Sequence, residues 1–87
     1  MPELSRFYGI IIYMFAKDHP PPHCHVKYGE YMGLINIKTG ELIEGKLPLR
    51  ALRLVQDWID LHQADLEKNW EEAQTDHPDF QKIEPLE

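Results

Sequence analysis

The sequence has one cysteine, Cys24, among its 87 residues. A single thiol cannot form an internal disulfide or supply a cysteine-based metal site, which favours a reducing compartment. The sequence also has no apolar run near the roughly 20 residues that span a bilayer, and its first residues lack the pattern of a signal peptide. We therefore expect a cytoplasmic protein without a membrane segment.

Positive charge is scarce as well, because nine Lys and Arg face fifteen Asp and Glu, for a net charge of −6. The acidic excess is confined to residues 47–87, which carry four basic and ten acidic side chains, whereas residues 1–46 carry five of each. Binding of duplex nucleic acid needs a patch of basic side chains. The charge therefore does not favour a nucleic-acid partner.

The length and the apolar fraction of 43% suit one small domain that buries its own core. We expect a single α+β domain over residues 1–87. Its strands should lie within about 5–45, its helical region over about 48–75, and an irregular tail over 76–87.

The first half of the sequence has the pattern of strands. Residues 7–15 are β-branched and aromatic, which we interpret as one central strand that is apolar on both faces. Over residues 23–28 the even-numbered side chains are apolar and should face the core, while the odd-numbered ones face away. Turns lead to strands at 31–38 and about 41–44. Because the connections are short, we expect an antiparallel meander of about four strands.

From Pro48 onward the apolar residues recur with helical period. They form a stripe of Leu52, Val55, Ile59, Leu66, Trp70 and Ala73. His62 lies in the stripe, where we expect a partly buried histidine, and a break between two helices at this residue is the alternative to one continuous helix. The sequence thus predicts one long or broken C-terminal helix packed on one face of the sheet, with Trp58 and Trp70 in the core or at an interface.

The segment from Asp18 to His25 holds three of the five histidines, His19, His23 and His25. Three consecutive prolines precede His23, and they should make a stiff loop that holds its ends apart. If His23 and His25 open a strand, they project from one face about 6–7 Å apart. Imidazole is a common metal ligand, and His19 or Asp18 could complete a site for zinc or another divalent transition metal.

Two other functions fit the same residues. His23 and His25 could act as general acid and base in a metal-independent ribonuclease toxin, with Arg6, Lys17 or Lys27 stabilising the phosphorane charge. Alternatively, the chain is a noncatalytic module that binds a small protein partner through an exposed apolar patch near Trp58 or Trp70, or that forms a homodimer. The residues alone do not decide whether the protein is an enzyme.

Four stretches carry a resemblance to a known family: SRFYGI at 5–10, DHPPPHCHV at 18–26, GKLP at 45–48 with RAL at 50–52, and NW at 69–70. Together they resemble the DUF4160 family of small prokaryotic proteins. The resemblance implies a compact bacterial domain that is often encoded beside another small domain, and hence a member of a toxin–antitoxin-like pair. It assigns no catalytic residues. Pro20 and Cys24 depart from the usual pattern without removing a histidine.

Overall fold

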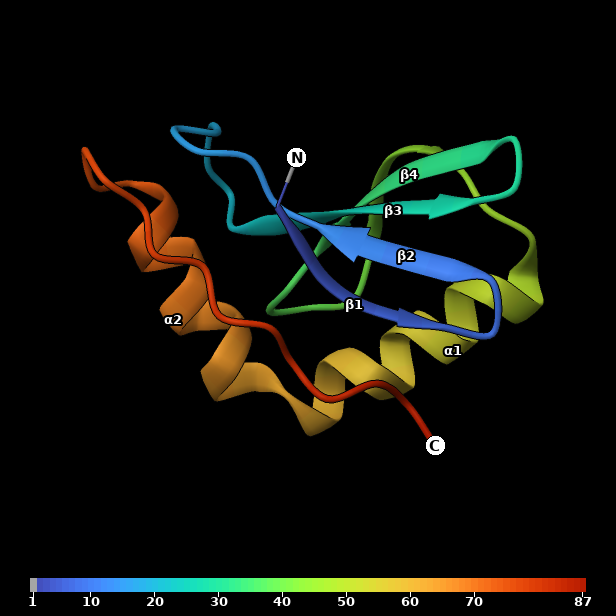
Figure 1. Ribbon diagram of the computed structural model, residues 1–87. Coiled ribbons are helices and arrows are strands. Elements are labelled where there is room, and N and C mark those ends of the chain that lie inside the picture. Colours follow the sequence, from blue (N-terminus) through green and yellow to red (C-terminus); the bar gives the residue numbers. More distant parts are fainter. Residues whose placement is uncertain (1) are drawn as a thin grey trace.

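The protein, seen in a computed structural model that describes residues 2–87, is a five-stranded antiparallel sheet followed by two helices (Figure 1). The elements are β1 (Glu3–Phe7), β2 (Ile10–Tyr13), β3 (His23–Tyr28), β4 (Tyr31–Asn36), β5 (Leu42–Lys46), α1 (Leu49–Leu61) and α2 (Gln63–Ala73). Each strand pairs with its successor along the chain, so the α+β class and the meander are confirmed. Within residues 2–87, neither helix is long and apolar enough to cross a bilayer.

The additional strand arises from a tight hairpin that the sequence pattern hides. Tyr8 and Gly9 both have positive φ, of 50° and 80°, and Phe7 pairs directly with Ile10. A two-residue turn with both residues in the left-handed region matches the twist of the strands it joins. The prediction of one strand over residues 7–15 is therefore wrong, because this apolar run folds back on itself at Gly9.

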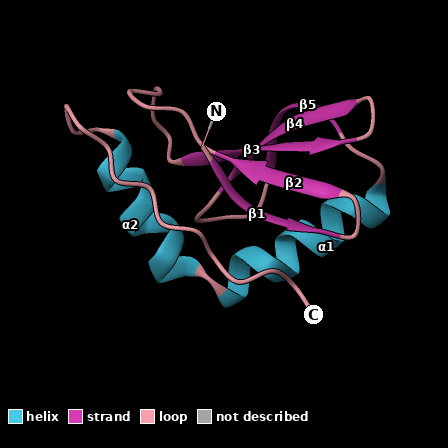
Figure 2. Ribbon diagram, in the orientation of Figure 1, coloured by secondary structure: helices cyan, strands magenta, loops and turns pink. Residues whose placement is uncertain are grey.

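The helices cover one face of the sheet (Figure 2). Cys24 and Val26 of β3 are fully buried in the core that the sheet shares with the helices, as alternation predicted. The side chains that α1 buries are Ala51, Val55, Trp58 and Ile59. The sequence left open whether one long helix or a broken one follows the sheet, and the structure has two helices: α1 ends at Leu61 and α2 begins at Gln63, with His62 between them.

The segment after α2 contains no helix or strand, yet it is packed against the domain. The backbone N–H of Ile83 donates to the Leu4 carbonyl of β1 at 2.8 Å. The indole N–H of Trp58 donates to the Glu84 carbonyl at 2.8 Å. Trp58 is thus a fully buried core residue that the tail helps to cover, and it cannot form an exposed docking patch.

The other face of the sheet, here called the open face, carries the side chains that alternate away from the core. Directly paired residues lie on the same face of an antiparallel sheet. The strand register therefore places one row across all five strands, consisting of Glu3, Tyr13, His25, Leu34 and Glu44. The next row consists of Arg6, Ile11, Lys27, Met32 and Lys46.

Candidate metal centre

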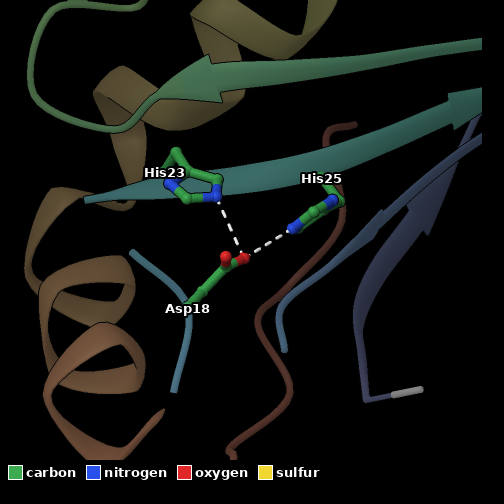
Figure 3. A group of neighbouring side chains, drawn as sticks. All are labelled: Asp18, His23 and His25. Carbon is green, nitrogen blue, oxygen red and sulfur yellow. Dashed lines mark hydrogen bonds and ion pairs between the residues drawn. The ribbon is translucent and has the colours of Figure 1, made fainter. Parts of the chain in front are cut away.

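The loop between β2 and β3 is anchored to the end of α2. The backbone N–H of Lys17 donates to the Ala73 carbonyl at 2.7 Å, and its ammonium lies 3.2 Å from the Asp76 carboxylate. The next residue, Asp18, is thereby placed over the start of β3. Its carboxylate points at His23 and His25, which project side by side from the open face (Figure 3). The prediction that the proline loop holds its ends apart is therefore wrong.

One carboxylate oxygen serves both imidazoles. Asp18 Oδ2 lies 3.0 Å from His23 Nε2 and 2.8 Å from His25 Nε2. The other oxygen, Oδ1, accepts the backbone N–H of His19 at 3.1 Å. The three side chains are largely shielded from solvent, with exposed fractions of 6% for His23, 16% for His25 and 23% for Asp18.

Asp18 is ionised at neutral pH in these surroundings. Burial of its carboxyl group acts to raise the pKa, but the hydrogen bond from His25, the backbone N–H of His19 and the nearby imidazoles outweigh it and hold the pKa below its ordinary value. The site therefore presents a carboxylate anion to both histidines.

The surroundings of His23 fix which ring nitrogen carries a proton. His23 Nδ1 lies 2.8 Å from the Pro21 carbonyl oxygen, which can only accept, so Nδ1 is the N–H donor. In a neutral imidazole the Nε2 atom is then a bare lone pair, and it faces the Asp18 carboxylate at 3.0 Å. Two lone pairs at this distance repel each other. A positive charge is needed between them, either a proton on Nε2 or a metal ion.

Aromatic side chains hold both imidazoles in place. Tyr13 stacks on His25 with ring centroids 5.2 Å apart and an interplanar angle of 18°, and Phe15 meets the same ring edge-on at 4.6 Å. Trp70 of α2 lies 5.3 Å from the His23 ring. These contacts restrict the ring rotations and exclude water from part of the site.

The structure brings together some of the candidate residues and separates others. Ligand atoms of Asp18, His23 and His25 all lie within 4.8 Å of one another. His19 is exposed and does not belong to this group, although its backbone contacts Asp18. Lys27 lies on the same strand and face as the two histidines, whereas Arg6 lies two strands away and binds Glu3 at 2.7 Å.

A depression of about 260 Å³ adjoins the cluster. Asp18 and His23 line it from the loop and β3, while Leu34 and Glu44 line it from β4 and β5. Sequence reasoning missed Glu44, Tyr13 and Trp70 as neighbours of the histidines. Strand alternation alone could have placed Glu44 on the open face, but no local signal indicates that Trp70 contacts His23.

Comparison with known proteins adds a family without adding an activity. The family model described as "Domain of unknown function (DUF4160)" matches residues 9–71, which is more than half of the chain and includes the whole histidine cluster. No curated protein and no solved structure matches the chain.

Proposed function

The chain belongs to the DUF4160 family, whose description assigns no function, and we propose from its own residues that it binds a divalent transition metal ion through Asp18, His23 and His25. Two imidazole nitrogens and one carboxylate oxygen are ligands that zinc accepts, and the same set with open positions binds iron(II) in oxygenases. Such a centre leaves at least one coordination position for water or a substrate.

The distances between the ligand atoms support the proposal. A tetrahedral zinc ion with bonds of about 2.0–2.1 Å keeps its ligand atoms about 3.3 Å apart. The two Nε2 atoms lie 2.8 and 3.0 Å from Asp18 Oδ2, and all three ligand atoms lie within 4.8 Å. Shifts of about 1 Å or less per side chain would therefore open room for the ion.

The observation that carries the proposal is the orientation of His23. Its Nδ1–H donates to the Pro21 carbonyl, and this is the outer hydrogen bond that metal-bound histidines make through their second nitrogen. The free Nε2 atom then faces an anion that it cannot approach without a cation between them. A divalent metal ion satisfies the His23 and Asp18 lone pairs together, and His25 supplies the third ligand.

The test is a zinc, nickel and cobalt titration of the purified protein without a histidine tag, together with elemental analysis. We expect one ion per chain with a Kd below about 10 μM, about −7 kcal/mol, and no such site in a His23→Ala/His25→Ala variant. His77→Ala is the matched control, because His77 is exposed and lies outside the cluster. Equal affinity of the double variant and the wild type would refute the site.

A metal-independent ribonuclease is the second candidate, and the placement of Lys27 favours it. Lys27 follows His25 on the same face of β3, so a cation stands beside two imidazoles that share a carboxylate. Such an enzyme should cleave RNA in the presence of a chelator and lose activity in His23→Ala. Cleavage that requires added metal would reject this mechanism in favour of the metal centre.

The toxin–antitoxin-like pairing implied by the family resemblance remains a prediction. The large exposed apolar side chains of α1 are Leu49 and Leu61, which are 61% and 70% exposed. A partner that binds α1 should protect its backbone amides from hydrogen exchange. A metal-site variant such as His23→Ala should leave that protection unchanged, because the histidines lie on the opposite face of the sheet.

A further inference from the structure

The row of the open face next to the His25 row is cationic. It contains Arg6, Lys27 and Lys46, with Ile11 and Met32 between them. Arg6 is engaged by Glu3 at 2.7 Å, whereas Lys27 and Lys46 have no ion pair within the part of the chain described, residues 2–87. Two ammonium groups are therefore available beside the candidate metal centre.

The spacing of the strands brings these two lysines near each other. Both pair directly with Met32, so they stand about 10 Å apart, which is two strand separations. Lys27 is also two residues from His25 along β3, about 7 Å. Both side chains are exposed and long enough to converge on one small anion above Met32.

A depression lies over β4 beside Met32, the residue that pairs with both lysines, although neither lysine lines it. It has a volume of about 250 Å³, and its lining includes His25, Met32, Leu34 and Glu44. Met32 and Leu34 make much of the surface apolar, and His25 is the member of the histidine cluster that lines it. The depression therefore suits a small molecule with an apolar body rather than a nucleic-acid chain.

We infer that this depression binds a phosphate monoester carried on a small apolar or aromatic body, with Lys27 and Lys46 contacting the phosphate oxygens. The part of this inference that places a third phosphate oxygen on the metal ion rests on the proposed function. A phosphate offers enough oxygens for both lysines and the ion, and lysine is a common ligand of phosphate. Glu44 is the one acidic side chain in the lining, and its charge opposes the anion.

The probe is phenyl phosphate, titrated into isotope-labelled, zinc-loaded protein and followed by amide chemical shifts. We expect saturable shifts at Met32 and Glu44, and a Kd at least tenfold weaker in Lys27→Ala/Lys46→Ala. The control is Lys68→Ala/Lys82→Ala, because both of these lysines are exposed and lie outside the sheet. Glu44→Gln should bind the probe more tightly, since it removes the opposing charge.

The outcomes separate this inference from the proposed metal site. The phosphate site is overturned if the wild type binds zinc but shows no saturable shifts with phenyl phosphate. It is also overturned if the folded Lys27→Ala/Lys46→Ala variant binds phenyl phosphate with the wild-type Kd. In both cases the metal centre is unaffected. Saturable, lysine-dependent binding in a protein that takes up no zinc supports the phosphate site and removes the metal from it. Binding that is strengthened by zinc and weakened by the double variant supports both.

Discussion

Asp18→Asn tests the metal centre by replacing one carboxylate oxygen of Asp18 with an NH2 group. The substitution preserves the size of the side chain but removes the negative charge that the two imidazoles share. In the metal-free variant, the introduced side-chain NH2 group can donate one N–H to the bare His23 Nε2 atom, so the repulsion between lone pairs disappears, and its second N–H can bind His25 Nε2 once the His25 proton resides on Nδ1. We therefore expect the metal-free variant to stay folded while its zinc affinity falls.

The size of the effect follows from linkage between binding and folding. At a free zinc concentration one hundred times the Kd, binding stabilises the folded state by about 2.7 kcal/mol. In a domain of this length each kcal/mol raises Tm by about 4–8 °C, so zinc should raise the wild-type Tm by roughly 11–22 °C. Loss of an outer hydrogen-bond partner weakens metal binding by about 10–100-fold, so loss of a ligand should weaken it by at least about 100-fold.

At the same zinc concentration the variant then keeps a stabilisation of only about 0.4 kcal/mol, and its Tm should rise by no more than about 3 °C. The assay is thermal unfolding followed by circular dichroism, with and without zinc. Asp60→Asn is the matched control, because Asp60 is exposed on α1 and should keep the full shift. Equal zinc-induced shifts in Asp18→Asn and the wild type would refute the assignment of Asp18 as a ligand.

Three further predictions concern stability and reactivity. The pKa of Asp18 is lowered in the folded state, so its contribution to stability is complete above about pH 4 and is lost as the pH falls through the folded pKa. Acid should therefore reduce the urea midpoint of the metal-free wild type more than that of Asp18→Asn. Gly45→Ala should lower the free energy of unfolding, measured with urea, by at least about 2 kcal/mol more than Gly29→Ala does. A Cβ at Gly45 would meet the Met32 carbonyl oxygen, whereas one at Gly29 meets nothing within 4 Å. Equal losses in the two variants would contradict this reasoning. Complete burial raises the pKa of Cys24 to about 12, so an aromatic disulfide reagent at pH 8 should label this thiol only after the protein unfolds. Labelling of the native protein as fast as the unfolded protein would show instead that the sheet opens.

Strand alternation is a local property, which is why the sequence alone could place the histidines correctly. It assigned His23 and His25 to one face and buried Cys24 on the other, and this is what the structure has. The hairpin at Tyr8-Gly9 was not predicted, because the apolar run continues through the turn without a polar residue to mark it. The turn also lacks the usual Asn-Gly or Asp-Gly pair.

The arrangement of the site could be anticipated only in part, because its remaining contacts join segments that are distant in the sequence. Asp18 reaches the histidines since Lys17 is hydrogen-bonded to Ala73 at the end of α2. Trp70 lies against His23 for the same reason, namely that α2 ends beside the proline loop. No spacing rule within the Asp18–His25 segment carries this information, so Asp18 and His19 could not be ranked as the third ligand.

The protonation of His23 connects these contacts to the chemistry of the cluster. Pro21 holds the Nδ1 proton, and the Asp18 anion requires a cation at Nε2, so a proton and a metal ion compete for the same atom. Where Nε2 is protonated, zinc binding must release that proton, and the affinity must fall as pH is lowered. The His25 Nε2–H group donates to Asp18, so this atom must also lose its proton, to solvent or to its own Nδ1 atom, before it can bind the ion. A site whose zinc affinity did not fall as the pH was lowered would have to use other atoms than these.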